Sequence, residues 1–450
     1  MRVSNALTRR RLWYALIGGI VLILILLVRL AYVQLWIGPE LSQRAEASWR
    51  RDIPFAAKRG EIWDRNGERL AYNVTSPTLL AVPAQVKNPE ETAAKLADVL
   101  GVSRESILEL ITRKESKVYI RPAGVKISEE KANEIRELNL PGIWVAEDNK
   151  RYYPFGSLAA HVLGFTGIDN QGLTGVERAY DKQLTGISGS ISYLSDARGE
   201  MMPGSKGNYQ KPIDGLHLQL TIDAYIQSVM EREFDQAWLE HQPDHILGIA
   251  MDPNTGDILA MASRPTYDPG NYLNYPTEVY NRNLPIWMTY EPGSTFKIIT
   301  LAAALEEGKV NLSDPFYDPG FIEVAGARLR CWKRGGHGSE TFQQVVENSC
   351  NPGFVVMGER LGKETLFDYI KRFGFGAKTG IDLGGEENGI LFKLSQVGPV
   401  ELATTSFGQG VSVTPIQQVA AVAAAINGGT LYKPHVAKAY IHPETGEVLQ

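Results

Sequence analysis

Ser294 and Lys297, three positions apart, are the first pair in this sequence whose side chains could carry out covalent chemistry. They open the segment STFKIITLAAALEEGK, whose apolar residues recur with the period of a helix, so both side chains are expected on one helical face. A serine attacks a carbonyl only when a base takes its proton, and a lysine serves as that base when burial or nearby positive charge lowers its pKa. Backbone N–H groups at the start of the helix would stabilise the resulting oxyanion.

A second polar element, Ser349-Cys350-Asn351, follows an apolar and helix-like stretch at 342–346. The order S-x-x-K and then S-x-N is used by serine enzymes that act on penicillin or on D-alanyl peptides. In such enzymes the hydroxyl relays a proton, and the amide positions the substrate and the lysine. Each element alone has a plainer interpretation, because S-x-x-K occurs by chance in many helices and polar turns often end a helix. Together they favour a catalytic site.

The composition is that of a globular protein with two or three domains, with 450 residues of which 44% are apolar and 22% charged. A net charge of −5 offers no basic surface to nucleic acid, and no phosphate-binding glycine loop occurs. His241 and His245 have the spacing of helical metal ligands, but Pro243 interrupts the helix between them. We therefore expect no cofactor, no metal and no nucleic-acid partner.

The N-terminal segment predicts a membrane anchor. Four arginines within the first 11 residues precede a run from 12 to 37 whose only charge is Arg29. A helix over 12–37, rising about 1.5 Å per residue, is long enough to cross a hydrocarbon core of about 30 Å with some tilt. The arginines place residues 1–11 in the cytoplasm and the remainder outside. The alternatives are a buried core helix and a cleaved signal peptide, whose apolar region is shorter.

Residues 50–205 show short strand, helix and turn patterns and no pair of nucleophile and base. A hairpin is predicted around Asn66-Gly67, since both residues tolerate positive φ. The stretches 88–101 and 102–114 are amphipathic helices, the second with Ser103 as its N-cap. These small α+β modules suggest a pedestal or a partner-binding region, although a simple spacer fits the same pattern.

Residues 215–450 form the last predicted domain, after proline and glycine residues that cluster at about 205–215. The domain opens with an alternating strand that runs into a helix, and then two strands joined by a turn at 254–256. We therefore predict an α+β protein whose last domain has an antiparallel sheet flanked by helices.

Five segments spread over nearly the whole chain carry a family resemblance: RGEIWDRNG at 59–67, YPFGSLAAHVLGFTG at 153–167, GLTGVERAYDKQLTGISG at 172–189, YEPGSTFK at 290–297 and TTSFGQGVSVTPIQQVAAVAAAINGG at 404–429. In these segments the chain resembles the class B penicillin-binding proteins, the monofunctional D,D-transpeptidases of cell-wall synthesis. The segment LRCWKRGGHG, together with YNRNLPIWMTYEPGSTFKIITLAAALEE, makes it most similar to the stage V sporulation type of that family.

The resemblance implies an anchor, a dimerisation or pedestal domain, and a transpeptidase domain of β-lactamase-like fold. It implies a serine acyl-enzyme that cross-links peptidoglycan stem peptides in spore cortex or septal wall, and that β-lactams inhibit. The residues that match the family's catalytic motifs are Ser294, Lys297, Ser349 and Asn351. It also implies a membrane partner, a glycosyltransferase of the shape, elongation, division and sporulation family, which Gly18-Gly19 would let approach closely.

The family has a third active-site element, a K-T-G strand that faces the serine. Lys378-Thr379-Gly380 has this sequence, but Gly374 and Gly376 precede it and IDLGGEENG follows, so neither side provides a strand. We interpret the triplet as a structural loop. The catalytic K-T-G is then expected beyond Gln450, in a C-terminal part that this sequence lacks, and a chain ending at Gln450 is expected to bind penicillin weakly.

Cys331 and Cys350, the chain's two cysteines, both lie in the predicted catalytic domain. Disulfides persist outside the cytoplasm, so the two form a possible redox pair. A bridge is expected to displace Ser349 or Asn351 and slow acylation, which a thiol reductase would reverse. A bridge without regulatory effect, or two thiols that never meet, are the alternatives. With His337 the cysteines resemble part of a zinc site, but the sequence shows no fourth ligand.

Three functions of different classes fit these observations. The first is a transpeptidase whose Ser294 is acylated by a stem peptide ending in D-Ala-D-Ala. The second is a β-lactam receptor or hydrolase, although hydrolysis requires a carboxylate that activates water and none can be assigned. The third is a non-catalytic scaffold for wall-synthesis partners.

Overall fold

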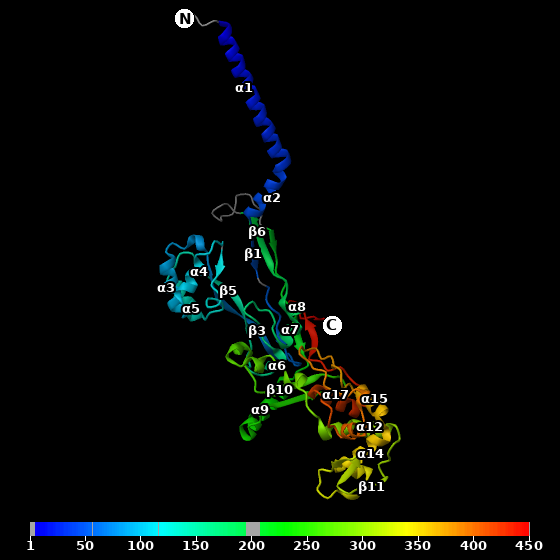
Figure 1. Ribbon diagram of the computed structural model, residues 1–450. Helices are drawn as coiled ribbons and strands as arrows, with labels where there is room; N and C mark the ends of the chain where they lie inside the picture. Colours follow the sequence, from blue (N-terminus) through cyan, green and yellow to red (C-terminus); the bar gives the residue numbers. More distant parts are fainter. Residues whose placement is uncertain (1–4, 56, 116, 195–207, 450) are drawn as a thin grey trace. The chain divides into compact units, whose positions relative to one another are not determined.

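The computed structural model describes residues 5–55, 57–115, 117–194 and 208–449 (Figure 1). These residues fall into two compact units. An N-terminal unit contains residues up to Ala57 together with Ile187–Ile213, and a main unit contains Lys58–Gly186 and Asp214–Gln450. The predicted boundary at about 205–215 lies partly outside the described residues.

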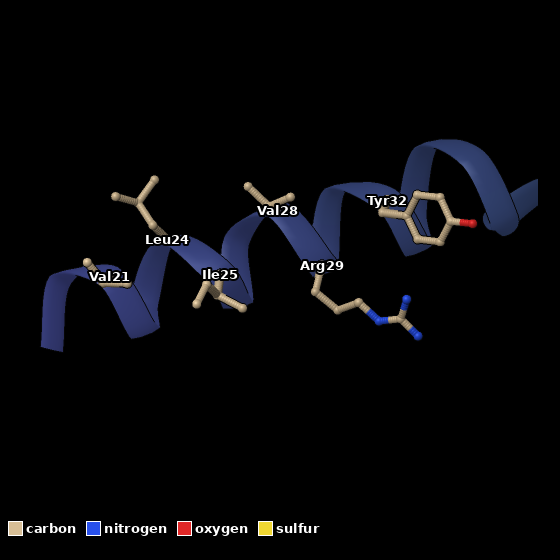
Figure 2. Close-up of a pocket in the computed structure, with 6 residues that line it drawn as sticks. All are labelled: Val21, Leu24, Ile25, Val28, Arg29 and Tyr32. Carbon is tan, nitrogen blue, oxygen red and sulfur yellow. The ribbon is translucent and has the colours of Figure 1, made fainter. Parts of the chain in front are cut away.

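The N-terminal unit begins with three consecutive helical segments, α1 (Asn5–Ala31), the π-helical η1 (Tyr32–Ile37) and α2 (Gly38–Trp49). Within the described chain, one helical stretch, Arg9–Ser42, is long and apolar enough to cross a membrane, and it contains the predicted span 12–37. Figure 2 shows the side of α1 where valine, leucine and isoleucine side chains are followed by Arg29 and Tyr32. The Arg29 guanidinium lies 5.6 Å from the centre of the Tyr32 ring.

A small antiparallel sheet completes this unit. Its order is β1 (Arg50–Phe55), β6 (Gly189–Leu194) and β7 (Asn208–Gln210), with β6 in the middle. The register pairs Arg50 with Leu194 and Phe55 with Gly189, so strands more than 130 residues apart in the sequence lie side by side.

The main unit contains a sheet assembled from distant parts of the chain. Its path is β16 (Val448–Leu449), β15 (Ala437–Ile441), β8 (His217–Leu220), β2 (Ile62–Trp63), β3 (Arg69–Ala81) and β4 (Val118–Tyr119), with β5 (Ile143–Tyr152) also paired to β3. The predicted hairpin is confirmed, because β2 and β3 pair antiparallel around a turn in which Gly67 has a φ of 91°.

Three helices cover one end of this sheet: α3 (Pro89–Leu100), α4 (Arg104–Ile111) and α5 (Glu129–Glu137). Both helices predicted from the pattern are confirmed. Ser103 is the N-cap of α4, as predicted, and its hydroxyl accepts a hydrogen bond from the N–H of Ser106. The apolar faces of these helices bury a core of their own with Leu79 and Ala81 of β3.

The first part of the domain predicted at residues 215–450 matches its prediction as well. β8 leads into α9 (Ala224–His241), and β9 (Ile246–Met251) pairs antiparallel with β10 (Ile258–Arg264). α9 packs against β10 and α17 (Pro415–Ile426) packs against β9, and Figure 1 shows α9 beside β10. Antiparallel strands flanked by helices are therefore present as expected.

A second helical core follows in the chain. It consists of α12 (Lys297–Glu306), α13 (Phe342–Glu347), α14 (Asn351–Leu361), α15 (Lys363–Arg372) and α16 (Pro399–Thr405). Two strand pairs adjoin it, β11 (Pro315–Asp318) with β14 (Gly338–Thr341) and β12 (Phe321–Val324) with β13 (Ala327–Arg330). Phe296, Phe354 and both cysteines are buried in this core.

Short helical segments connect these elements. They are η2 (Pro83–Gln85), α6 (Ala160–Leu163), α7 (Gly175–Ala179), α8 (Asp181–Thr185), η3 (Pro269–Asn274), α10 (Thr277–Tyr280), α11 (Leu284–Trp287), η4 (Gly293–Phe296) and η5 (Leu394–Gln396).

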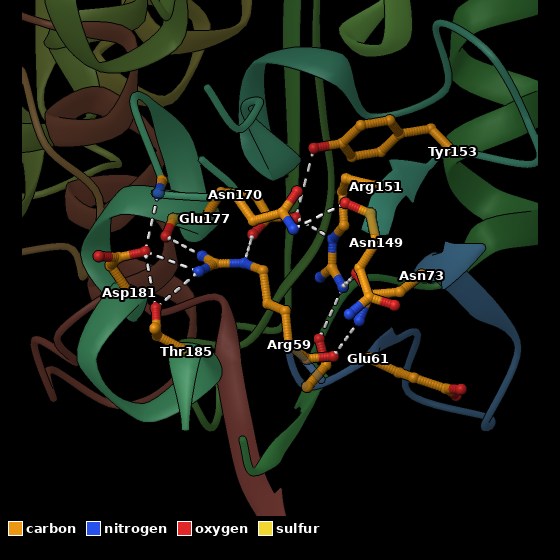
Figure 3. Close-up of polar contacts among 12 residues, drawn as sticks. Arg59, Glu61, Asn73, Asn149, Arg151, Tyr153, Asn170, Glu177, Asp181 and Thr185 are labelled. Carbon is orange, nitrogen blue, oxygen red and sulfur yellow. Dashed lines mark hydrogen bonds and ion pairs between the residues drawn. The ribbon is translucent and has the colours of Figure 1, made fainter. Parts of the chain in front are cut away.

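A buried cluster of charged groups joins two of the resemblance segments (Figure 3). Arg59 Nε lies 2.7 Å from Glu177 Oε2, and its Nη1 lies 2.7 Å from Asp181 Oδ1. Arg151 Nε binds the other Glu177 oxygen at 2.6 Å. The side chains of Arg59, Arg151 and Glu177 are at most 2% exposed. The segments at 59–67 and 172–189 are therefore held together by ion pairs in the interior of the main unit.

Candidate active site

Ser294 lies in η4, a single 3₁₀ turn directly before α12. The predicted helix is present, but its first turn is tighter than an α-helical one. Gly408 packs against this turn, and a Cβ on Gly408 would lie 2.2 Å from the Gly293 carbonyl oxygen, so only glycine fits. The N–H of Gly293 also donates to the Gly408 carbonyl at 3.0 Å. The segment at 404–429 thus supports the turn, on which Ser294 is exposed.

Lys297 is the first residue of α12 and is only 4% exposed. Phe296 and Ile299, on either side of it, are completely buried in the helical core. Thr300, one turn further, donates its hydroxyl proton to the Ser406 carbonyl at 2.8 Å. Because these neighbours fix the start of α12, the long side chain of Lys297 is held in place.

The Lys297 ammonium donates three hydrogen bonds to one short segment of the chain. Nζ lies 2.7 Å from the Ser349 carbonyl oxygen, 3.0 Å from Ser349 Oγ and 2.7 Å from Asn351 Oδ1. A lysine has three N–H donors, so each of them has a partner. All three acceptors are uncharged.

Burial lowers the pKa of Lys297 to about 8, well below its ordinary value, because a charged ammonium is poorly solvated in this position. The thiolate forms of Cys350 and Cys331 would raise the pKa in the opposite direction by a smaller amount. No carboxylate is among the described groups that stabilise the charge. A substantial fraction of this amine is therefore neutral near pH 8, as a general base must be.

The turn that accepts these bonds lies between α13 and α14. Ser349 has a φ of 51°, a left-handed conformation that costs a non-glycine residue about 1–2 kcal/mol. The turn is held by hydrogen bonds from the backbone N–H of Cys350 to the Val345 carbonyl and from Asn351 Nδ2 to the Arg330 carbonyl. Such strain persists only where surrounding contacts impose it, and it is common at functional sites.

The structure thus brings Lys297, Ser349 and Asn351 together as the sequence predicts. Ser294 lies one turn before Lys297, but among the described residues no hydrogen bond joins their side chains. The predicted contact is not made because the Lys297 donors are all directed at the 349–351 turn. Catalytic hydrogen bonds often form only when substrate is bound.

The triplet at 378–380 lies in a loop, as predicted, and not on a strand. Both Thr379 donors bind Glu386 Oε1 at 2.6 Å, and the Gly380 N–H binds Oε2 of the same residue. Nearby, Asp382 accepts hydrogen bonds from the Tyr180 hydroxyl and the Val436 N–H. These contacts give the T-G-I-D-L segment a structural role.

Cys331 and Cys350 are both buried and both free thiols. Asp318 and His337 lie with them, and the potential ligand atoms of all four residues lie within 4.8 Å of one another. The sequence showed no fourth potential metal ligand beside the two cysteines and His337. In the structure Asp318 is that fourth residue. The predicted disulfide stays a prediction. His241 is the last residue of α9, His245 lies beyond that helix, and both are exposed.

Comparison with known families identifies both folded domains. Residues 54–220 match the penicillin-binding protein dimerisation domain, and residues 246–448 match the penicillin-binding protein transpeptidase domain. The latter includes the turn with Ser294 and the turn at 349–351.

Among solved structures, a peptidoglycan synthetase from Bifidobacterium adolescentis superimposes with a TM-score of 0.70 at 25% identity, covering 89% of this chain and 77% of that one. Penicillin Binding Protein 2X from Streptococcus thermophilus gives a TM-score of 0.68 at 27% identity, covering 88% of this chain and 62% of that one. The fold is therefore shared over most of the chain.

Among curated proteins, Peptidoglycan D,D-transpeptidase FtsI of Escherichia coli K12 is 31% identical over 94% of this chain and 71% of its own length. Stage V sporulation protein D of Bacillus subtilis is 58% identical over all of this chain, which corresponds to 70% of that protein. With this identity and with both domains in that order, the chain belongs to the class B penicillin-binding proteins.

Proposed function

We propose that this protein is a peptidoglycan D,D-transpeptidase of spore cortex or septal wall that works through an acyl-enzyme on Ser294, with Lys297 as the general base. The observation that carries the proposal is the buried Lys297 amine, which lies one helical turn from an exposed serine and is surrounded by neutral acceptors. Its pKa of about 8 leaves about a tenth of the amine neutral at pH 7.

In the first half of the reaction, neutral Lys297 takes the proton from Ser294 Oγ as that oxygen attacks the carbonyl carbon of the penultimate D-alanine. The C–N bond to the terminal D-alanine then breaks, and the leaving amine receives a proton through Ser349 Oγ, which lies 3.0 Å from Lys297 Nζ. The products are free D-alanine and an ester between Ser294 and the stem peptide.

In the second half, an amine from a neighbouring strand attacks the ester carbonyl and loses a proton to the same lysine. The ester bond breaks, Ser294 regains its proton and a peptide cross-link forms. Asn351 Oδ1 holds Lys297 at 2.7 Å throughout, and its Nδ2 is held by the Arg330 carbonyl. A β-lactam uses only the first half, since its ring opens on Ser294 and leaves a stable ester.

The test is labelling with a fluorescent penicillin, applied to the complete gene product because the present chain corresponds to 70% of the length of the Bacillus relative. Ser294→Ala should abolish the label. Ser313→Ala, at an exposed serine of the same domain, is the matched control and should label normally. A label that survives Ser294→Ala contradicts the proposal.

Two other functions remain as distinct outcomes of the same assay. A scaffold would show no labelling in the complete wild-type protein. A β-lactam receptor would be labelled but would form no cross-links from stem peptides. A hydrolase would release the label quickly, which requires a carboxylate at the ester, and none lies among the described groups that affect Lys297.

We also propose that the protein spans the membrane once, with residues 1–11 in the cytoplasm and the catalytic domain outside. The support is the arginine-rich start, which the positive-inside rule assigns to the cytoplasm. Protease added to intact cells should digest the catalytic domain and leave an N-terminal tag protected. The reverse protection pattern would contradict this orientation.

The helix α1 is proposed as the binding surface for a membrane glycosyltransferase of the shape, elongation, division and sporulation family. A Cβ on Gly18 or Gly19 would meet nothing within 4 Å, so the helix backbone is bare there and another helix can approach closely. Exchange of residues 12–37 for an unrelated single span should end co-purification with the glycosyltransferase. Unchanged co-purification would leave α1 as an anchor only.

A redox role for Cys331 and Cys350, with a thiol reductase as partner, is the remaining proposal. The two sulfur atoms lie within 4.8 Å, and a bond requires them to approach to about 2.05 Å. The acylation rate of the complete protein before and after dithiothreitol tests this role. Equal rates in both states and in Cys331→Ser would exclude it.

A further inference from the structure

Four residues that end or begin secondary-structure elements converge beside the 349–351 turn. Asp318 is the last residue of β11, Cys331 follows β13, His337 precedes β14 and Cys350 precedes α14. Their carboxylate, sulfur and imidazole atoms all lie within 4.8 Å of one another. The pairing of β11 with β14 brings Asp318 beside Gly338, the residue after His337. The second pair, β12 with β13, ends directly before Cys331.

The backbone is shaped to place His337 against Asp318. Gly336 has a φ of 78°, and a Cβ there would lie 2.3 Å from the Asp318 carbonyl oxygen, so this close approach requires glycine. Asp318 Oδ2 accepts hydrogen bonds from the His337 N–H at 3.0 Å and from its Nδ1 at 2.9 Å. Cys331 Sγ lies 3.5 Å from the same Nδ1.

The cluster is buried among apolar side chains. The side chains of Asp318 and His337 are 0% and 5% exposed, and both cysteines belong to the core formed with Phe342 and Phe354. His337 Nε2 is buried and has no hydrogen-bond partner among the described residues. The pairing of Asp318 with His337 offsets part of the cost of burying a carboxylate and an imidazole, and a metal ion bound by both groups would offset it further.

We propose that Asp318, Cys331, His337 and Cys350 bind one zinc ion. Two sulfur ligands with an imidazole suit zinc, whereas magnesium and calcium select oxygen ligands. Four ligands of a tetrahedral zinc ion lie roughly 3.3–3.8 Å apart. On binding, the longer distances in the cluster, up to 4.8 Å, would shorten, and the 2.9 Å between Asp318 Oδ2 and His337 Nδ1 would lengthen. All four positions are filled by protein, which makes this a structural site and not a catalytic one.

The ion would fix the part of the molecule that holds Lys297. Cys350 lies between Ser349 and Asn351, whose side chains accept hydrogen bonds from Nζ, and Cys331 follows Arg330, whose carbonyl binds Asn351. Zinc would therefore join both segments that shape the strained turn. The value of holding Lys297 in place for catalysis rests on the proposed function, whereas binding of the zinc ion does not.

A disulfide between the same cysteines is the competing use of these sulfur atoms. A thiolate that ligates zinc is unavailable for a disulfide, so one molecule can hold the ion or the bond but not both. In the structure both cysteines are free thiols, and Asp318 and His337 place further ligand atoms within 4.8 Å of them, so this arrangement favours the ion.

The experiment measures metal directly. The 450-residue chain, membrane segment included, is purified in detergent under reducing conditions without chelator, and its zinc content is determined by mass spectrometry of the element. Roughly one ion per chain is expected. His337→Asn and Cys350→Ser should each lower the content at least about tenfold, whereas His245→Asn, at an exposed histidine, should not.

Cobalt substitution keeps the test valid if a variant folds poorly. Co²⁺ added to the chelator-treated wild-type chain should give the ultraviolet charge-transfer band of a thiolate ligand, and Zn²⁺ should remove that band. Zinc at background level in the reduced wild-type chain, or a cobalt complex without the thiolate band, would overturn the proposal. So would recovery of the reduced preparation as a metal-free disulfide. A penicillin label that survives Ser294→Ala would contradict the proposed function and leave the metal result unchanged, so the two proposals fail separately.

Discussion

Two of the buried basic sites in the main unit differ in their partners. Arg59 and Arg151 bind the Glu177 carboxylate at 2.7 and 2.6 Å, and Lys297 binds only uncharged oxygens at similar distances. Burial acts to lower the pKa of Arg59, but Glu177 and Asp181 outweigh it and raise the pKa above its ordinary value. At Lys297 burial prevails and the pKa falls to about 8.

The difference shows how one protein interior serves two purposes. A buried cation with a carboxylate partner stays charged, so the arginine cluster is a permanent connection between distant segments. A buried cation with only hydroxyl, carbonyl and amide oxygens around it is close to losing its proton and can exchange it with a substrate. Arginine does not deprotonate in proteins, so the residue type and the acceptors together decide which site supports structure and which supports chemistry.

Lys297→Arg should produce the largest effect. Arginine keeps the charge and hydrogen-bonding capacity but does not deprotonate, so acylation of the complete protein by penicillin should slow by about 10²–10⁴. The melting temperature should change little. The matched control is Lys309→Arg, at an exposed lysine. A variant that acylates within a few-fold of wild type would show that Lys297 is not the base.

Glu177→Gln should lower the stability of the protein and leave acylation unchanged, which is the reverse of the effects expected for Lys297→Arg. Removing the shared carboxylate leaves two buried guanidinium groups undercompensated and should lower the free energy of unfolding by about 3–5 kcal/mol. Denaturant unfolding measures this loss, and Glu147→Gln, at an exposed position on β5, is the control. Protein that remains folded should still be acylated at the wild-type rate. Wild-type stability in Glu177→Gln would refute a structural role for the cluster.

Asn351→Asp should give the buried Lys297 a carboxylate partner, as Arg59 and Arg151 have in Glu177. Wild-type acylation should rise with pH through about 8, because only the neutral amine accepts the serine proton. A carboxylate in place of the amide oxygen, now 2.7 Å from Nζ, should raise the Lys297 pKa and move this midpoint upward by about 1–3 units. The measurement is the pH profile of acylation, with Asn254→Asp at an exposed turn as control. An unmoved midpoint would mean that Lys297 does not set the profile.

Ser349→Gly, compared with Ser349→Ala, should give the smallest effect. Both variants remove the hydroxyl that accepts from Lys297, but only glycine relieves the strain of a φ of 51°. The glycine variant should be more stable than the alanine variant by about 1 kcal/mol. Thermal unfolding of the two proteins decides the point. Equal stability would show that the turn is not strained.

Local features of the sequence predicted much of this molecule. Period and capping located α4 behind Ser103, and the Asn66-Gly67 turn located the hairpin of β2 and β3. The motifs S-x-x-K and S-x-N allowed the prediction that Lys297 lies beside the 349–351 turn. These features depend on residues close in sequence or on recognisable motifs, so they can be predicted from the sequence.

Features that depend on tertiary pairing were not visible in the sequence. Asp318 joins His337 only because β11 pairs with β14, and nothing near Asp318 in the sequence marks it as a ligand. Arg59 and Glu177 are 118 residues apart, and nothing in the sequence indicated that they pair. The left-handed Ser349 was equally hidden, because glycine or asparagine would be the usual residue there.

The order of strands in the main unit also determines when this sheet can assemble. β2 at residue 62 pairs with β8 at residue 218, and β8 pairs with β15 near residue 440. Until the last of these strands has been synthesised, β8 has an open edge of unpaired N–H and C=O groups, which is prone to aggregation. Contacts so distant in sequence also slow folding. During synthesis from the N-terminus, the first 436 residues are therefore exposed to misassembly until β15 is made and pairs with β8.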